Sequence, residues 1–148
     1  MKRLVIDPGV LVSAFISPRR SAPSLIVEAI LDGRIDALSC PALIAELTDV
    51  LSREKFATHT AEGRGQAYIA SIAESTKHAE DPPAGEQQTA DPDDDYLLAL
   101  AHDQNADAII SGDKHLLDAA TETMPVLTPR QVADHLGLDD SAPVQSDE

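Results

Sequence analysis

The sequence contains no tryptophan, and aromatic residues make up only 3% of its 148 positions. The core must therefore consist of Leu, Ile, Val and Ala, a composition that suits helices packed on a parallel sheet. A single cysteine, Cys40, excludes an internal disulfide and favours a reducing, cytoplasmic location. No apolar run approaches the roughly 20 residues that a membrane-spanning helix needs. The opening stretch "MKRLVID" reaches an acid too early for a signal peptide.

Basic residues are also scarce. Only 11 Lys and Arg stand against 26 Asp and Glu, for a formal net charge of −15. This balance argues against binding of nucleic acid through a broad basic face, because such affinity is largely electrostatic. It leaves open an enzyme that engages phosphates through bound cations. The last ten residues are acidic and poor in apolar side chains, so we expect one domain at 1–138 and a disordered tail at 139–148.

Short apolar strands alternate with helices along most of the chain. Strands are predicted at 3–7, 34–40, 77–80, 107–111 and 125–128. Helices are predicted at 10–16, 24–33, 41–56, 60–76, 92–104, 113–120 and 129–136. Such β-α units form a largely parallel sheet that helices cover on both faces. The predicted fold class is therefore α/β, a three-layer α/β/α sandwich with a mainly parallel sheet.

Two acids follow strands of this predicted sheet. Asp7 ends the first strand, and Asp113 follows the strand "DAIIS" by two residues. Parallel strands present their carboxyl ends at one edge, where ligands bind in such folds, so both acids are predicted at that edge. Each also has a purely structural interpretation. Asp7 precedes a Pro8-Gly9 turn, and Asp113 can be a turn residue or a helix N-cap.

The run "DPDDD" at 91–95 opens the predicted helix at 92–104. Asp91 and Asp93 are explained by helix capping and by the helix dipole, which favours acids in a first turn. Asp95 lies a full turn inside a helix that is apolar in most directions. A carboxylate there is costly unless it is paired or binds a metal, so we assign Asp95 a functional role. Asp94 is left open between capping and metal binding.

A further acid, Glu46, lies at the border of the apolar stripe of the helix at 41–56. A rim salt bridge and a functional role fit that position equally well. Several carboxylates that converge on one point repel one another unless cations hold them together. Hard cations such as Mg²⁺ or Mn²⁺ take oxygen ligands and keep open positions for water and phosphate. Such a site can activate water and stabilise the leaving oxygen of a phosphodiester.

Four segments resemble, in order and spacing, the PIN-domain proteins: "LVIDPGVLVSAFISP", "CPALIAELTDVLSREKF", "DPDDDYLLALAHDQNADAIISGDKHLL" and "PVLTPRQVADHL". The resemblance covers residues 2 to about 136 and points to bacterial toxin components of toxin–antitoxin systems, related to the VapC ribonucleases. It implies an α/β/α sandwich and Mg²⁺- or Mn²⁺-dependent endonucleolytic cleavage of single-stranded RNA. Carried over by position, the catalytic and metal-binding acids are Asp7, Glu46, Asp95 and Asp113. Asp94 is a candidate for a further metal ligand on the sequence alone.

The resemblance also implies partners. We expect a single-stranded RNA substrate, a cognate antitoxin protein and a homodimer, and no membrane. Lys114, beside Asp113, is a candidate contact for substrate phosphates. Arg19 and Arg20, in the loop after the first helix, are candidates for the same contact or for the antitoxin, although a solvated loop is the simpler interpretation.

Two departures from the family pattern support an alternative. The family's first strand ends in Asp-Thr-Asn or Asp-Ser-Asn, whereas this chain reads Asp7-Pro8-Gly9, and His115 stands where an acid is common. Loss of a hydroxyl and an amide would loosen the orientation of Asp7. The alternative to a ribonuclease, even a weakly active one, is thus an impaired PIN-fold module that only binds metal or a partner. A receiver-like phosphoacceptor domain is disfavoured, because Asp7 lacks a second acid beside it.

Overall fold

A five-stranded parallel sheet forms the centre of the computed structural model, which describes residues 3–17, 20–83 and 95–138. The strands are β1 (Arg3–Ile6), β2 (Asp36–Ser39), β3 (Lys77–His78), β4 (Ala108–Ile110) and β5 (Val126–Leu127). Their order across the sheet is β3-β2-β1-β4-β5, and neighbouring strands pair in parallel. The predicted α/β fold class with a parallel sheet is therefore confirmed.

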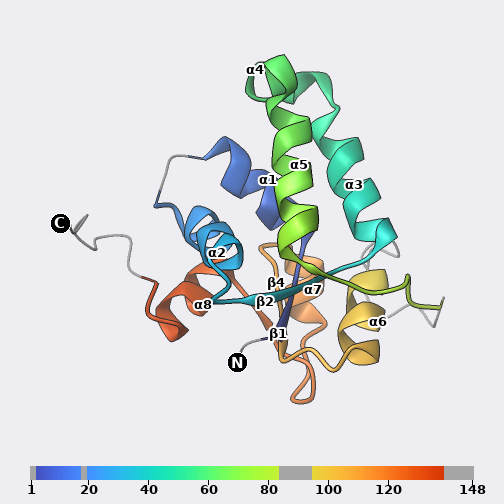
Figure 1. Cartoon of the computed structure of the whole chain (residues 1–148). Coiled ribbons are helices and arrows are strands. Elements are labelled where there is room, and N and C mark those ends of the chain that lie inside the picture. Colours follow the sequence, from blue (N-terminus) through green and yellow to red (C-terminus); the bar gives the residue numbers. More distant parts are fainter. Residues whose placement is uncertain (1–2, 18–19, 84–94, 139–148) are drawn as a thin grey trace.

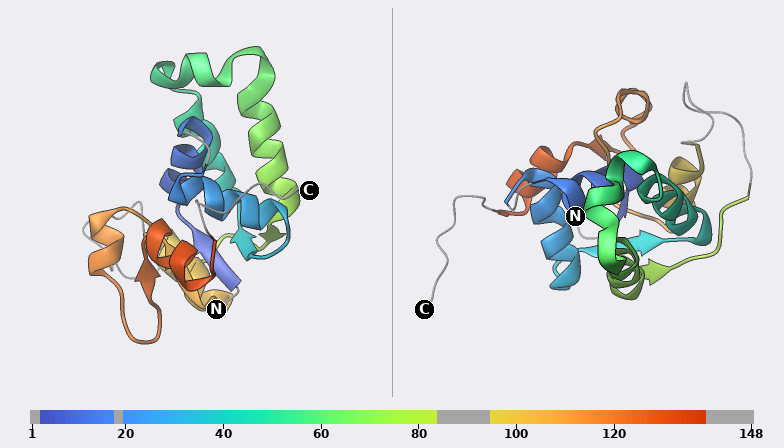
Figure 2. Two further views of the ribbon diagram at one scale, coloured as in Figure 1. Left: turned by 90° about the vertical axis from the view of Figure 1, so that its left-hand side faces the viewer. Right: turned by 90° about the horizontal axis from the view of Figure 1, so that it is seen from above.

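Helices cover both faces of this sheet, as the sequence predicts. They are α1 (Pro8–Ile16), α2 (Ala22–Leu31), α3 (Pro41–Leu51), α4 (Ala57–Thr60), α5 (Arg64–Ser75), α6 (Asp95–Asp103), α7 (Lys114–Asp118) and α8 (Pro129–His135), with short 3₁₀ helices η1 (Glu54–Phe56) and η2 (Ala61–Gly63). Crossovers between parallel strands are almost always right-handed, a rule that predicts α1 to α5 on one face and α6 and α7 on the other. In agreement, α1 packs against α2 and α3, whereas α6 packs against β1 and β4 (Figure 1). Figure 2 shows that α4 and the start of α5 extend away from the sheet.

The chain reverses its direction across the sheet between β1 and β4. From β1 it runs outward to β2 and β3, then crosses back to β4 and continues to β5. β1 and β4 are therefore neighbours, and Ile6 pairs with Ile110 at their carboxyl ends. Such a reversal creates a crevice at the carboxyl edge of an open α/β sheet, where ligands bind. Asp7 directly follows β1, so it stands at the mouth of this crevice.

The hydrophobic core surrounds the two central strands. In β1, Leu4, Val5 and Ile6 are all buried, and every residue of β4 is buried as well. Strands that are covered on both faces need apolar residues on both, so they read as continuous apolar runs rather than alternating ones. This is why "RLVI" and "AII" were recognisable as strands.

The helix boundaries differ from the prediction at several places, and the cause is clear at two of them. Pro8 and Gly9 form the first turn of α1 instead of a turn before it, because proline is well suited to the first helical position and Asp7 caps the helix. The helix predicted at 60–76 begins only at Arg64, because Gly63 has a left-handed backbone with φ of 80°. That conformation favours glycine and interrupts a helix.

Some predictions fall outside the described residues. The first part of the helix predicted at 92–104, including Asp93 and Asp94, is one of them, and the tail at 139–148 is another. Among the residues that the structure does describe, no helix is long and apolar enough to cross a membrane.

Candidate active site

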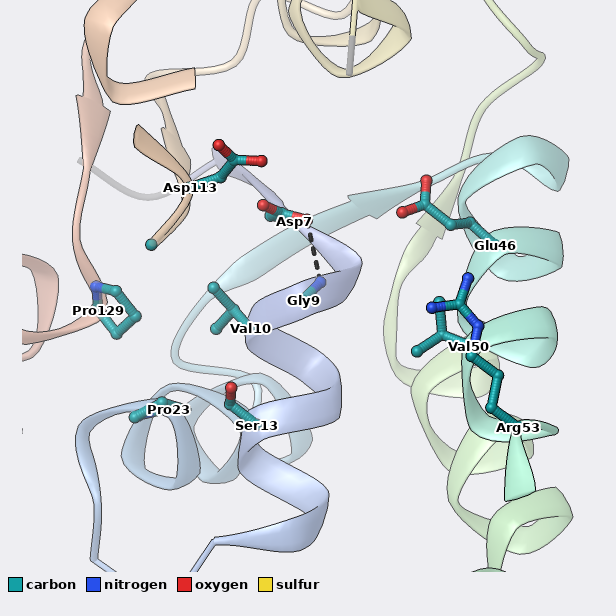
Figure 3. A pocket seen from close by; sticks show the side chains of 11 residues that line it. Asp7, Gly9, Val10, Ser13, Pro23, Glu46, Val50, Arg53, Asp113 and Pro129 are labelled. Atoms are coloured by element: carbon teal, nitrogen blue, oxygen red, sulfur yellow. Dashed lines mark hydrogen bonds between the residues drawn. The ribbon is translucent and has the colours of Figure 1, made fainter. Parts of the chain in front are cut away.

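A pocket of about 660 Å³ opens at the carboxyl edge of the sheet. Asp7 and Asp113 line one side of it, and Glu46 lines the opposite side from α3 (Figure 3). The structure thus brings three of the four predicted acids around one space, although they are far apart in the sequence. Asp7 and Asp113 come from the ends of neighbouring strands, which is the arrangement that the parallel sheet predicts.

Asp7 is held in a fixed orientation by three hydrogen bonds. Its backbone N–H donates to the carbonyl oxygen of Ile110 at 2.9 Å, which continues the pairing of β1 with β4. Its Oδ1 accepts a hydrogen bond from the backbone N–H of Gly9 at 2.9 Å, which caps α1. Its Oδ2 accepts one from the Ser111 hydroxyl at 2.7 Å. With only 7% of its surface exposed, Asp7 is the only charged residue among the buried residues that the structure describes.

The burial of Asp7 disfavours its negative charge. Burial raises the pKa of Asp7, the hydrogen bonds from Gly9 and Ser111 lower it, and the charge of Asp113 raises it again. The net effect is a raised pKa. A buried carboxylate close to a second acid gains stability when a cation binds between them, so the electrostatics of this site favour a positive ligand.

Ser111, which the sequence alone did not indicate, links the two strand-end acids. It is fully buried directly after β4. Its hydroxyl donates to Asp7 and accepts a hydrogen bond from the backbone N–H of Asp113 at 2.9 Å. Asp113 in turn caps α7, because its Oδ1 accepts from the N–H of His115 at 2.8 Å. The N-cap interpretation of Asp113 is therefore correct, and the residue still lines the pocket.

Glu46 has a partner that the sequence did not indicate. Its Oε1 accepts a 2.7 Å hydrogen bond from the hydroxyl of Tyr96, which is 50 residues away on α6. Burial raises the pKa of Tyr96, and the hydrogen bond and charge of Glu46 raise it further, so this phenol stays protonated. This bond to a neutral donor is a contact that the rim salt-bridge interpretation of Glu46 did not include.

Asp95 is the first residue of α6 that the structure describes. It is partly exposed and is not among the residues that line the pocket. Asp94 lies outside the described residues. Within the described parts of the chain, no three Asp, Glu, His or Cys side chains are gathered in a group that could hold a metal ion. The carboxylates of the pocket are the donor type that Mg²⁺ and Mn²⁺ prefer. Their chemistry fits such an ion, but the side chains would have to draw together to bind it.

Two of the predicted phosphate contacts, Lys114 and Arg20, do not line the pocket. Lys114 is exposed, forms an ion pair with Asp118 at 2.7 Å and does not line the pocket. Arg20 does not line it either, and Arg19 lies outside the described residues. Arg53, which follows α3, is the basic residue that does line the pocket, and it pairs with Asp49 at 3.4 Å. The helix predicted at 41–56 ends earlier, at Leu51, so Arg53 lies beyond its end.

Comparisons with known proteins identify a family. Residues 3–115 match the family model described as PIN domain. The crystal structure of PAE2754 from Pyrobaculum aerophilum resembles the chain with a TM-score of 0.58, covering 94% of this chain and 91% of that one. At 16% identity this likeness shows the fold alone. No curated protein matches the chain.

Proposed function

The chain belongs to the PIN domain family, whose members are typically metal-dependent nucleases, and from this premise we propose that it is a Mg²⁺- or Mn²⁺-dependent endoribonuclease. Its proposed substrate is single-stranded RNA, and its proposed role is that of the toxin in a toxin–antitoxin pair. The observation that carries the proposal is the pocket that Asp7, Glu46 and Asp113 line together.

Asp7, Glu46 and Asp113 would hold the ion, with Asp95 as a fourth acid. Asp95 precedes Tyr96, whose hydroxyl contacts Glu46, so the start of α6 lies beside the α3 side of the pocket. Asp94 stays a candidate ligand on the sequence alone. A bound Mg²⁺ or Mn²⁺ supplies an activated water and stabilises the leaving oxygen of the phosphodiester.

The residues around Asp7 support activity despite the altered turn. The family's hydroxyl and amide after the first-strand acid are replaced by Pro8 and Gly9. In this chain the N–H of Gly9 and the hydroxyl of Ser111 each bind one oxygen of Asp7. Hydrogen bonds of this kind orient a carboxylate that binds metal. Asp7 is thus oriented without the side chains that the family usually provides there.

Arg53 is a further proposed phosphate contact, beside the candidates Lys114, Arg19 and Arg20 that the sequence offers. A guanidinium can bind two phosphate oxygens at once, and Arg53 already lines the pocket with the acids. An antitoxin would neutralise the enzyme by placing basic side chains in the same acidic pocket. A homodimer and a cytoplasmic location are part of the same proposal.

A second candidate is a PIN-fold module that binds metal or a partner without cleaving RNA. The observation that favours it is that the described acids do not form a preassembled group of three metal ligands. Catalysis needs ligands that are held close to their working geometry, so a site that must close around its ion can bind it and still turn over slowly.

The deciding experiment is cleavage of a mixed-sequence single-stranded RNA by the purified protein in Mg²⁺ or Mn²⁺, with EDTA as a control. The Asp7→Asn, Glu46→Gln, Asp95→Asn and Asp113→Asn variants should each lose metal-dependent cleavage. Asp118→Asn is the matched control, because it removes an exposed acid of α7 that lies outside the pocket. Calorimetric binding of Mn²⁺ without cleavage would favour the binding module. Cleavage that survives in all four of these variants would identify a contaminating nuclease.

A further inference from the structure

Tyr96 connects the two helical layers of the molecule at the candidate active site. Its hydroxyl donates to Oε1 of Glu46 at 2.7 Å. Glu46 belongs to α3, on the face of the sheet that also carries α1, whereas Tyr96 belongs to α6, which packs against β1 and β4 on the other face. The contact therefore passes across the carboxyl edge of the sheet, beside the pocket that Glu46 lines.

The surroundings of Tyr96 place its hydroxyl close to more than one acid. Its ring is partly buried, and the charges of Glu46 and Asp7 both act on its hydroxyl. A phenol that stays neutral can only donate to a carboxylate. The hydroxyl of Tyr96 thus provides Glu46 with a donor and adds no charge to a pocket that is already acidic.

Glu46 gains more than Asp7 does from a hydrogen bond that restricts its side chain. Asp7 has a short side chain and two hydrogen bonds of its own. Glu46 has a longer side chain with one more rotatable bond, and it faces the pocket from the opposite wall (Figure 3). A flexible ligand loses side-chain entropy when it binds an ion. A hydrogen bond that already restricts the side chain removes part of this loss before the ion arrives.

We propose that Tyr96 is a positioning residue for Glu46, and that its hydroxyl strengthens divalent-ion binding by holding this carboxylate at the pocket. This inference rests on the proposed function, because it assigns Glu46 to the ion. Residues that hydrogen-bond to metal-binding side chains typically change metal affinity by about 10- to 100-fold when they are replaced. A purely structural role, in which the phenol only satisfies its own buried hydroxyl, predicts no such change.

The contact itself can be measured without any metal. The chain has two tyrosines and no tryptophan, so a Tyr68→Phe protein has Tyr96 as its only tyrosine fluorophore. The hydroxyl of Tyr68 donates to the backbone carbonyl of Leu11 at 2.6 Å instead of to an acid. A carboxylate that accepts a hydrogen bond from a phenol quenches its emission. Adding Glu46→Gln to the Tyr68→Phe protein should therefore raise its emission, and unchanged emission would show that Tyr96 does not hold Glu46.

Metal affinity then tests the positioning role. Calorimetric titration with Mg²⁺ and with Mn²⁺ should show about tenfold weaker binding in Tyr96→Phe and unchanged binding in Tyr68→Phe. In a Glu46→Gln background, Tyr96→Phe should cause no further loss, because the two residues act through one interaction. Equal affinities of the wild type and Tyr96→Phe would overturn the positioning role. Circular dichroism confirms that each variant is folded.

The failure of this inference differs from the failure of the proposed function. A wild type that binds ions but does not cleave RNA would refute the nuclease, while the affinity ratio of wild type to Tyr96→Phe still decides the role of Tyr96. A wild type that binds neither ion would refute both the metal site and the positioning role. The emission measurement would then show only whether the contact exists.

Discussion

Ser111 donates a 2.7 Å hydrogen bond to Oδ2 of Asp7, although the two residues are 104 positions apart in the chain. The same hydroxyl accepts from the backbone N–H of Asp113. One buried serine therefore joins the two acids that follow β1 and β4. Ser111 lies at the point where the chain reverses its direction across the sheet. Because its hydroxyl bonds to both acids, their orientation depends on a neutral residue between them.

Replacement of this serine should weaken metal binding as well as the fold. Ser111→Ala leaves an oxygen of Asp7 and the N–H of Asp113 without their partner, and we expect a loss of roughly 1–3 kcal/mol of stability. Metal affinity should fall about tenfold, because Asp7 is no longer held. Ser39→Ala is the matched control. Ser39 is equally buried at the end of β2 and is bonded to Thr76, and it does not line the pocket. A similar loss of metal affinity in both variants would contradict the prediction.

The stability of the protein should depend on pH through Asp7. Burial raises the pKa of Asp7 in the folded state above its unfolded value of 3.8. Between these two pKa values the folded state holds more protons than the unfolded state, so stability falls as the pH rises through that window. At neutral pH the charge of Asp7 therefore destabilises the fold.

Asp7→Asn should consequently raise the melting temperature at pH 7 by about 3 °C, which is roughly 1 kcal/mol for a domain of this size. The difference should vanish below pH 3.8, where the carboxyl is protonated in both states. Scanning calorimetry at several pH values measures it. Added Mg²⁺ should stabilise the wild type but not the variant, since an ion that binds only the folded state shifts its stability. If the wild type is more stable than Asp7→Asn at neutral pH in EDTA, the charge of Asp7 does not destabilise the fold and the prediction is wrong.

Arg53 should contribute to RNA binding but not to metal binding. Arg53→Ala is expected to raise KM severalfold and to leave kcat nearly unchanged. The dependence of RNA affinity on salt concentration should fall by the amount expected for the loss of about one phosphate contact. Arg34→Ala is the control. Arg34 and Arg53 have equally exposed side chains at 55%, and each pairs with an aspartate at 3.4 Å. Arg34 lies outside the pocket. Equal effects of the two substitutions on KM would indicate a general loss of positive charge rather than a specific contact.

Asp81 should stabilise the helix that carries Glu46. The N-cap residue of α3, Cys40, makes no side-chain capping bond. Asp81 supplies one from 39 residues away, because its Oδ1 accepts from the N–H of Ala42 at 2.8 Å. Asp81→Ala should therefore cost about 1 kcal/mol in chemical denaturation, while Asp81→Asn should retain most of the cap. Glu80→Ala, at the neighbouring exposed position, should have little effect. A loss for Glu80→Ala as large as that for Asp81→Ala would argue against the cap.

The order of the elements was predictable because it depends on local patterns. Apolar runs such as "RLVI" and "AII" are continuous because their strands are covered on both faces. Alternation of strands and helices then implies a parallel sheet, and a parallel sheet brings Asp7 and Asp113 to one edge. Boundaries were less predictable. The helix expected from residue 60 starts at Arg64, because backbone conformations at Glu62 and Gly63 interrupt it.

The partners within the site were not predictable. Tyr96 reaches Glu46, and Ser111 reaches Asp7, only because particular helices and strands pack at particular angles. Arg53 lines the pocket because α3 ends at Leu51 and the chain turns there. In the sequence these three residues look like an ordinary aromatic, a strand-end serine and an exposed base.

The sequence by itself determined the α/β class, the parallel sheet and the edge at which Asp7 and Asp113 stand, because each follows from local periodicity and from the direction of neighbouring strands. Only the tertiary structure decided which neutral side chains hold the acids, and that Glu46 faces Asp7 across a pocket. These contacts join residues 50 and 104 positions apart. Their geometry depends on how whole helices pack over the sheet, and no local pattern of residues encodes it.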